Sequence, residues 1–187
     1  MVVGGSGKDV GKTALVCAVI AALPEFGWTA VKITGHEYEG GSGDANSPGD
    51  SQPVIREELS ASQETDTARY LAAGARRALL VTRSGPKVPI EEIRRALGPG
   101  RNVIYESNRI VEVIKPDLCL ALVGDGAEKK PSFQRLLREA DAVVSAGSVI
   151  ENSPLGALRF PLESVDRLPA EMVDWLRERL GEAGSRA

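Results

Sequence analysis

The sequence predicts an α/β fold in which a mostly parallel sheet is covered by helices on both faces. Short apolar segments alternate along the chain with segments whose apolar residues recur at helical spacing. The short segments are apolar at successive positions, which is typical of strands that are buried on both sides. A glycine-rich turn joins the first strand to the first helix. The length of 187 residues suits one α/β domain, so residues 1–187 are expected to form a single domain.

The first half of the chain gives two strands, two helices and a long loop. The first strand is Met1-Val2-Val3, and an apolar helix over 14–23 follows the glycine-rich turn. A second strand is predicted over 28–34. The polar segment 37–63 is rich in glycine and proline, which predicts a long flexible loop that is either functional or disordered. A helix over 66–73 comes next.

The second half continues the alternation. Pro89 suits the first turn of a helix, and Gly98 is placed to end it. Pro161 is acceptable in a strand that lies at the edge of a sheet. The remaining strands are predicted at 78–82, 102–105, 117–123, 141–145 and, at an edge, 158–161; the remaining helices are predicted at 89–97, 132–140 and 169–180, with a frayed tail over 182–187.

The glycine-rich turn carries the strongest chemical signal. Gly11-Lys12-Thr13 opens the first helix, as in the phosphate-binding pattern G-x-x-x-x-G-K-[S/T]. Successive backbone N–H groups surround a phosphate in such a turn, and the helix N-terminus adds partial positive charge. Lys12 is expected to reach the β- and γ-phosphates, and the Thr13 hydroxyl is expected to bind Mg²⁺. The residues expected to contact the nucleotide are Gly5, Ser6, Gly7, Lys8, Asp9, Val10, Gly11, Lys12, Thr13 and Ala14.

The turn departs from the phosphate-binding pattern at one position. Ser6 stands where the pattern has glycine, and Gly5 comes one residue early. A glycine matters there because it accepts a backbone torsion that side chains resist. The alternative is a purely structural turn before a core helix, but it does not explain a lysine and a threonine at the start of an apolar segment. We therefore predict binding of a nucleotide or phosphate.

Three polar residues close to strand ends and helix starts are candidates for the same site, because ligands gather at the carboxyl ends of parallel strands. Glu106 follows the strand over 102–105, and we predict a ligand of Mg²⁺ or its water there in preference to a helix-capping or loop glutamate. Lys32 is expected to meet an anion, and its alternative is an edge-strand lysine that faces solvent. Asp66 is either a second metal carboxylate or the cap of a helix.

Further polar residues give weaker signals. Ser107 and Asn108 could hydrogen-bond phosphate or water, whereas His36 is interpreted as an ordinary surface residue. For Asp125 a plain Asp-Gly turn is preferred over a contact with the γ-phosphate. The pair Lys129-Lys130 is interpreted as a solvated turn. The segment 145–148, together with Asn152, stands where a loop that contacts the base is expected. Its residues do not decide whether the base is adenine or guanine.

Composition excludes several classes of function. A formal net charge of −3 argues against nucleic acid as the main partner. No apolar run reaches the ~18 residues that span a bilayer, and no secretory signal precedes the turn, so no membrane partner and a cytoplasmic location are expected. Cys17 and Cys119 lie in apolar segments, as small core residues of a reducing compartment. A single histidine makes a zinc site improbable.

With these residues in view, the chain resembles P-loop proteins of the branch that contains molybdopterin-guanine dinucleotide biosynthesis protein B and dethiobiotin synthetase. The loop from Gly5 to Thr13 is similar to that of dethiobiotin synthetase, which also lacks the expected first glycine, and both families carry a lysine at the position of Lys32. Asp66-Thr67 and Glu106 resemble the corresponding stretches of the molybdopterin protein. The likeness covers about the first 110 residues; Ser107 departs from it, since a glycine usually follows the glutamate.

The resemblance implies a P-loop NTPase fold and a Mg²⁺-dependent GTPase or ATPase that acts as an accessory factor in molybdopterin-type cofactor biosynthesis. Lys12, Glu106, Asp66 and Lys32 would be catalytic, and Thr13, Glu106 and Asp66 would hold the metal. One alternative is an ATP-dependent synthetase or kinase like dethiobiotin synthetase; another is a nucleotide-gated binding module with little turnover. A small molecule or a protein would bind at the 37–63 loop, and relatives in this branch often work as homodimers.

Overall fold

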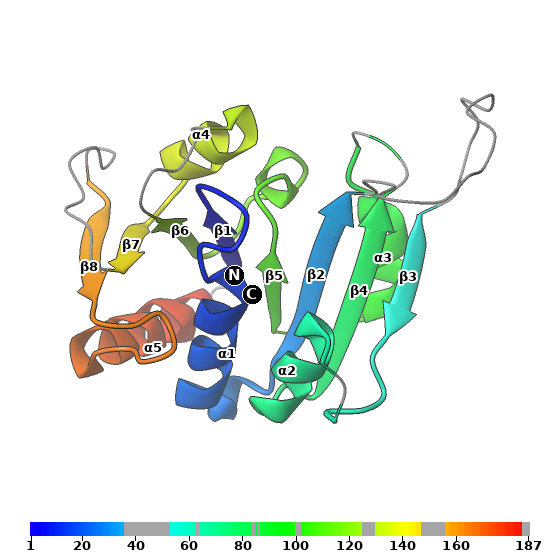
Figure 1. Cartoon of the computed structure of the whole chain (residues 1–187), viewed down its shortest axis with the longest axis horizontal. Helices are drawn as coiled ribbons and strands as arrows, with labels where there is room; N and C mark the ends of the chain where they lie inside the picture. The colour runs from blue at the N-terminus through cyan, green and yellow to red at the C-terminus, as the bar shows by residue number, and fades with distance from the viewer. Residues whose placement is uncertain are drawn as a thin grey trace.

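The apolar segments of the sequence pair side by side in one sheet. The computed structural model describes residues 1–35, 53–62, 64–83, 85, 87–99, 102–124, 130–146 and 156–184. Its strands lie in the order β3-β4-β2-β5-β1-β6-β7-β8, as Figure 1 shows. Every neighbouring pair is parallel except β3 and β4, which are antiparallel. The predicted α/β class and mostly parallel sheet are confirmed.

The strands and helices have the following bounds. The strands are β1 (Val2–Gly5), β2 (Thr29–Gly35), β3 (Val54–Glu57), β4 (Arg77–Arg83), β5 (Val103–Glu106), β6 (Cys119–Val123), β7 (Ala142–Ala146) and β8 (Leu158–Leu162). The α-helices are α1 (Lys12–Ala22), α2 (Asp66–Ala72), α3 (Ile90–Leu97), α4 (Pro131–Arg138) and α5 (Ala170–Gly184), and two short 3-10 helices are η1 (Pro24–Phe26) and η2 (Ile110–Glu112).

Helices cover both faces of the sheet because successive strand residues point to opposite sides. On one face α1, α2 and α5 pack on a core that includes Val3, Leu120 and Leu122. On the other face α3, α4 and η2 pack on a second core that includes Val2 and Ala121. In Figure 1 α1, α2 and α5 lie in front of the sheet and α3 lies behind it. The strands are therefore buried on both sides, as their continuous apolar runs predict.

The predicted long loop over 37–63 is wrong in part, because β3 (Val54–Glu57) lies within it. This strand pairs antiparallel with β4, with Ile55 opposite Val81, and three of its four residues are exposed. An edge strand of this kind lacks the apolar run that marks the interior strands. Residues 36–52 and 63, and with them His36, lie outside the described residues.

The C-terminal end also differs from its prediction. A frayed tail was expected over 182–187, but α5 continues to Gly184, and Glu182 pairs with Arg179 one turn earlier. Residues 185–187 are outside the described part. The expected edge strand with Pro161 is confirmed, since β8 ends the strand order. Among the helices of the described residues, none has the length and apolar character needed to cross a bilayer.

Strand register places two of the candidate residues next to each other. Lys32 on β2 is the Cα partner of Glu106 on β5, and Glu106 is in turn the partner of Val3 on β1. Ala30 and Ile104 precede Lys32 and Glu106 by two residues, and both belong to the core under α1 and α2. Since side chains two residues apart share a face, Lys32 and Glu106 both point toward those two helices.

Candidate functional site

The turn between β1 and α1 presents a row of backbone donors. Gly11, at the N-cap of α1, has φ 98°, and Asp9 has φ 59°. No side chain caps the helix, and within the described part of the chain the main-chain N–H groups from Gly7 to Ala14 have no hydrogen-bond acceptor. Backbone in such conformations forms a concave nest for an anion, and the helix dipole adds to its positive potential. The geometry suits a phosphate group.

Ser6 does not disturb this turn, so the reason given for a glycine at that position is wrong. The positive φ angles fall at Asp9 and Gly11, not at Ser6. Ser6 is buried; its N–H donates to the Leu122 oxygen at 2.9 Å, and its Oγ accepts from the Gly124 N–H at 3.0 Å. The serine therefore ties the turn to the end of β6. The requirement for glycine falls one residue earlier, as the next contact explains.

Gly5 and Asn108 form a two-bond clamp at the start of the turn. The Gly5 N–H donates to Asn108 Oδ1 at 2.8 Å, and Asn108 Nδ2 donates to the Gly5 oxygen, also at 2.8 Å. A Cβ on Gly5 would lie 2.7 Å from Val10 Cγ2, so a side chain at this position would require the Val10 side chain to shift. Sequence reasoning gave Asn108 and Ser107 as residues that could hydrogen-bond phosphate or water. In the structure Asn108 holds the main chain of the turn, and the Ser107 hydroxyl accepts from the Arg109 N–H.

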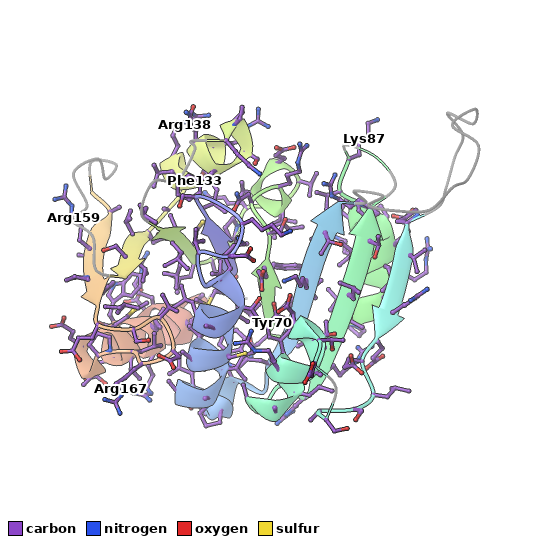
Figure 2. The ribbon with its side chains drawn as sticks, in the orientation of Figure 1. Tyr70, Lys87, Phe133, Arg138, Arg159 and Arg167 are labelled. Carbon is purple, nitrogen blue, oxygen red and sulfur yellow. The ribbon has the colours of Figure 1, made fainter. Side chains whose placement is uncertain are left out.

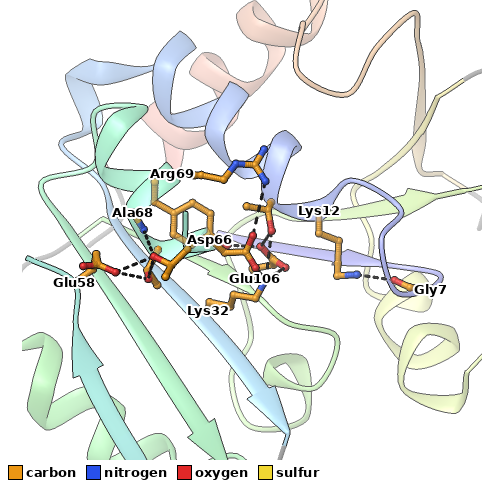
Figure 3. A network of polar contacts seen from close by, with 12 residues as sticks. Gly7, Lys12, Lys32, Glu58, Asp66, Ala68, Arg69 and Glu106 are labelled. Carbon is orange, nitrogen blue, oxygen red and sulfur yellow. Dashed lines mark hydrogen bonds and ion pairs between the residues drawn. The ribbon is translucent and has the colours of Figure 1, made fainter. Parts of the chain in front are cut away.

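Lys12 lies over the turn. Its Nζ donates to the Gly7 oxygen at 2.6 Å, so the side chain reaches back across the row of backbone donors (Figure 3). Burial lowers the pKa of the Lys12 ammonium; the negative charge of Glu106 opposes this shift, and the positive charge of Lys32 adds to it. The ammonium can leave the Gly7 oxygen for a stronger acceptor, and a phosphate in the nest would be one.

Glu106 is the centre of a buried polar cluster between β5, α1 and α2, shown in Figure 3. Its side chain is 4% exposed. The Thr13 hydroxyl donates to Oε2 at 2.8 Å, the Tyr70 hydroxyl also donates to Oε2, and Lys32 Nζ donates to Oε1 at 3.0 Å. A buried carboxylate is stable when it is paired and fully hydrogen-bonded in this way. The loop-glutamate alternative for Glu106 is therefore wrong.

Lys32 lies within the cluster and not at a sheet edge. Strand β2 runs between β4 and β5, so the solvent-facing alternative for this lysine is wrong. Besides Glu106, its Nζ contacts Thr13 Oγ1 at 3.3 Å and forms an ion pair with Asp66. Burial by itself would lower the pKa of Lys32, but Glu106 and Asp66 outweigh it and raise that pKa above the ordinary value.

Asp66 is not the cap of α2. Thr65 is the N-cap, since its Oγ1 accepts the Ala68 N–H at 3.1 Å. The Asp66 carboxylate instead meets Lys32 and lies 3.8 Å from Arg69 Nη1. Partial burial would raise the pKa of Asp66, but the hydrogen bond from Lys32 outweighs it, and the pKa is lowered. The structure thus brings Asp66, Lys32, Glu106 and Thr13 together, as the sequence predicts.

Tyr70 is the member of the cluster that sequence reasoning missed. It is fully buried on α2, one turn after Asp66, with its ring in the core and its hydroxyl on Glu106 (Figure 2 labels it). Burial and the negative charge of Glu106 both raise the pKa of its hydroxyl, which therefore stays a donor. Its signal was its spacing: residues i and i+4 share a helix face, so a tyrosine four residues after a site carboxylate points to the same place.

Other candidates fall outside this cluster. Asp125, Lys129 and Asn152 are not among the described residues, and neither are positions 147 and 148 of the expected base-contacting segment. Ser145 is described and is buried in β7. Lys130 is exposed just before α4. Cys17 and Cys119 are both free thiols.

The oxygen atoms of the cluster fit a hard cation such as Mg²⁺. The Thr13 hydroxyl and the carboxylates of Glu106 and Asp66 all converge on the Lys32 ammonium, which shows that a positive charge is stable at that point. Mg²⁺ prefers oxygen ligands and is commonly held by one or two carboxylates together with substrate phosphates. In the part of the chain that is described, no group of three or more His, Cys, Asp or Glu side chains gathers in one place.

The site thus consists of an anion nest on α1, a lysine over that nest and an adjoining cluster of oxygens. A site with this arrangement can bind a phosphate and a cation at neighbouring points. Comparison of the chain with protein-family models and with curated proteins found no match in either set.

Proposed function

We propose that this chain is a P-loop nucleoside triphosphatase that depends on Mg²⁺. The observation that carries the proposal is the row of backbone donors from Gly7 to Ala14 directly beside the hydrogen-bonded pair of Thr13 and Glu106. The first element suits a polyphosphate, and the second suits the cation that accompanies it. The strand–turn–helix order and the motif Gly11-Lys12-Thr13 support the same assignment.

Each residue has a defined task in this proposal. The N–H groups of the turn bind the phosphates, and Lys12 leaves the Gly7 oxygen to bridge the β- and γ-phosphates. Thr13, Glu106 and Asp66 would hold Mg²⁺ and its water, and Lys32 would face the γ-phosphate or a bound partner. When bound, Mg²⁺ neutralises charge that develops on the phosphate oxygens. Catalysis by these residues would be mostly positioning and electrostatic stabilisation.

The biological role follows from the resemblance of the phosphate loop, Lys32, Asp66 and Glu106 to the molybdopterin branch of P-loop proteins. We propose an accessory role in the biosynthesis of a molybdopterin-type cofactor, with GTP or ATP as the nucleotide, for a single-domain cytoplasmic protein that can form a homodimer. The segment 37–63, which includes β3, would contact a small-molecule or protein partner.

Calorimetric titration with GTP and with ATP, each with and without Mg²⁺, tests the proposal. We expect saturable binding that Mg²⁺ strengthens, and we expect Lys12→Ala to weaken binding by about 100-fold or more, because it removes the phosphate-bridging charge. The matched control is Lys87→Ala: Lys87 is exposed on the loop after β4 and points away from the site in Figure 2. Binding of neither nucleotide, or equal binding by wild type and Lys12→Ala, refutes the assignment.

The same titrations separate the other candidate functions. Preference for GTP favours the accessory role. Preference for ATP, with phosphate release that requires an added small carboxylic acid, favours a synthetase or kinase like dethiobiotin synthetase. Tight binding with negligible turnover favours a nucleotide-gated module.

A further inference from the structure

The Lys32 ammonium occupies the place where the proposed metal ligands converge. Its three contacts are Thr13 Oγ1 at 3.3 Å, Glu106 Oε1 at 3.0 Å and an Asp66 carboxylate oxygen. These are the hydroxyl and the two carboxylates that the proposed function gives to Mg²⁺. A lysine ammonium has three N–H donors and no lone pair, so it can replace a cation among these oxygens but cannot ligate one.

Lys32 is built into this position and does not reach it from the surface. It stands on β2, an interior strand, and the parallel register sets its Cα opposite that of Glu106. Its side chain is 18% exposed. A divalent ion among the same oxygens would meet a positive charge at short range, and repulsion at low effective dielectric is strong. The ammonium and the metal therefore exclude each other unless the ammonium moves to another anion.

A phosphate in the nest would be such an anion. Thr13 is both a contact of Lys32 and a residue of the unpaired amide row, so the ammonium already lies beside the first turn of α1. We propose that Lys32 is a resident cation of the Glu106–Asp66 pair, which keeps divalent metal out until a nucleotide phosphate draws the ammonium away. This inference rests on the proposed function and adds a role to it: nucleotide and metal must then bind cooperatively, each raising the affinity for the other.

The test measures metal binding in the absence of nucleotide. Mn²⁺ binds to the same oxygen ligands that hold Mg²⁺, and electron paramagnetic resonance measures the concentration of free Mn²⁺ directly. We expect wild type to bind Mn²⁺ weakly, and we expect Lys32→Met to bind it on the order of tenfold more tightly. Lys87→Met removes the same charge at an exposed position and should behave as wild type. The double variant Lys32→Met with Glu106→Gln should lose the gain, because it removes a ligand.

The outcomes are decisive in each direction. Equal or weaker Mn²⁺ binding by Lys32→Met overturns the inference, and so does a gain that survives Glu106→Gln. Lys32→Met leaves a buried carboxylate without its ion-pair partner, so its folding needs a separate measurement. A destabilised Lys32→Met must gain more in melting temperature from added Mn²⁺ than Lys87→Met does; an equal gain counts against the inference.

Failure of the proposed function is distinguishable. If wild type binds neither GTP nor ATP, the nucleotide assignment falls, whereas the Mn²⁺ comparison of Lys32→Met with wild type keeps its meaning. If wild type binds a nucleotide with Mg²⁺ but Lys32→Met shows no gain in Mn²⁺ affinity, only the role of Lys32 falls.

Discussion

The Tyr70 hydroxyl donates a hydrogen bond to Glu106 Oε2, so a core residue of α2 fixes the carboxylate that ends β5. Thr13 on α1 donates to the same oxygen at 2.8 Å. Two helices thereby hold one acidic group, and its orientation depends on both.

Removal of the Tyr70 hydroxyl should therefore weaken both stability and metal binding. We expect Tyr70→Phe to lower the free energy of unfolding by about 1.5–3 kcal/mol, because the buried carboxylate loses a donor. Metal affinity in the presence of nucleotide should fall roughly tenfold, as for other residues that orient a metal ligand. Urea unfolding and Mg²⁺ titration measure the two effects. The control is Tyr105→Phe, in the core on the opposite face of the sheet; identical effects for both variants would contradict the prediction.

The clamp between Asn108 and Gly5 should control nucleotide affinity. We expect Asn108→Ala to cost about 1–3 kcal/mol of unfolding free energy and to weaken nucleotide binding, because both main-chain groups of Gly5 lose their partner. Asn102→Ala is the matched control: Asn102 Nδ2 makes one exposed hydrogen bond, to the Phe26 oxygen at 2.8 Å. Calorimetric titration of both variants with nucleotide checks the prediction. The prediction fails if Asn108→Ala and Asn102→Ala change the nucleotide affinity by the same factor.

Gly11 should tolerate a side chain less well than Gly74 does, although both have similar φ angles of 98° and 105°. A Cβ on Gly11 would lie 2.8 Å from Val165 Cγ2, whereas a Cβ on Gly74 would have nothing within 4 Å. Gly74→Ala should cost about 1–2 kcal/mol from backbone strain alone, and Gly11→Ala should cost about 1–3 kcal/mol more from overpacking. In a double-mutant cycle measured by chemical denaturation, Val165→Ala should remove most of the extra loss of unfolding free energy caused by Gly11→Ala. If Gly11→Ala is equally destabilising in the Val165→Ala background, the contact is refuted.

Stability should fall in acid partly through Glu57. Hydrogen bonds from Arg77 Nε at 2.7 Å and Nη2 at 2.8 Å hold the pKa of Glu57 below its ordinary value of 4.5. A lowered folded-state pKa means that this stabilisation is present above about pH 4.5 and is lost as the pH falls through the folded-state pKa. Because Glu57 is partly exposed, the effect should be under about 1 kcal/mol.

Urea unfolding between pH 7 and pH 3 should therefore show a shallower acid decline for Glu57→Gln than for wild type. Glu91→Gln is the control, since Glu91 pairs with Arg94 on the more exposed surface of α3. A decline that Glu57→Gln leaves unchanged would contradict the prediction.

The sequence was sufficient for the residues whose signal is local. Gly11-Lys12-Thr13 is contiguous, and Glu106 directly follows an apolar run, so both were found without the fold. Asp66 and Lys32 were found as candidates, but the structure decided their alternatives: Thr65, the residue before Asp66, takes the cap of α2, and β4, which is distant in the chain, covers the outer side of β2. The place of the metal and of the nucleotide stays a prediction.

The misses at β3 and at Tyr70 share a physical cause, which is dependence on tertiary pairing. The four residues of β3 form a strand because β4 offers an edge, and nothing in their own pattern requires it. The pattern around Tyr70 predicts only a helix, because its ring lies in the core and its hydroxyl meets Glu106 on β5. Ser6 differs for a local reason, because the positive φ angles of the turn fall at Asp9 and Gly11.

The strand order sets the sequence of events during synthesis. β1 leaves the ribosome before both of its neighbours in the sheet, β5 and β6, which begin at Val103 and Cys119. The nascent chain must hold β1, one of the two middle strands of the described sheet, unpaired until those segments emerge, and such long-range closure is slow. Val165, which packs on Gly11, arrives later still. The turn between β1 and α1 is thus translated before the elements that complete it, and a fragment that ends before β5 would leave β1 unpaired and prone to aggregation.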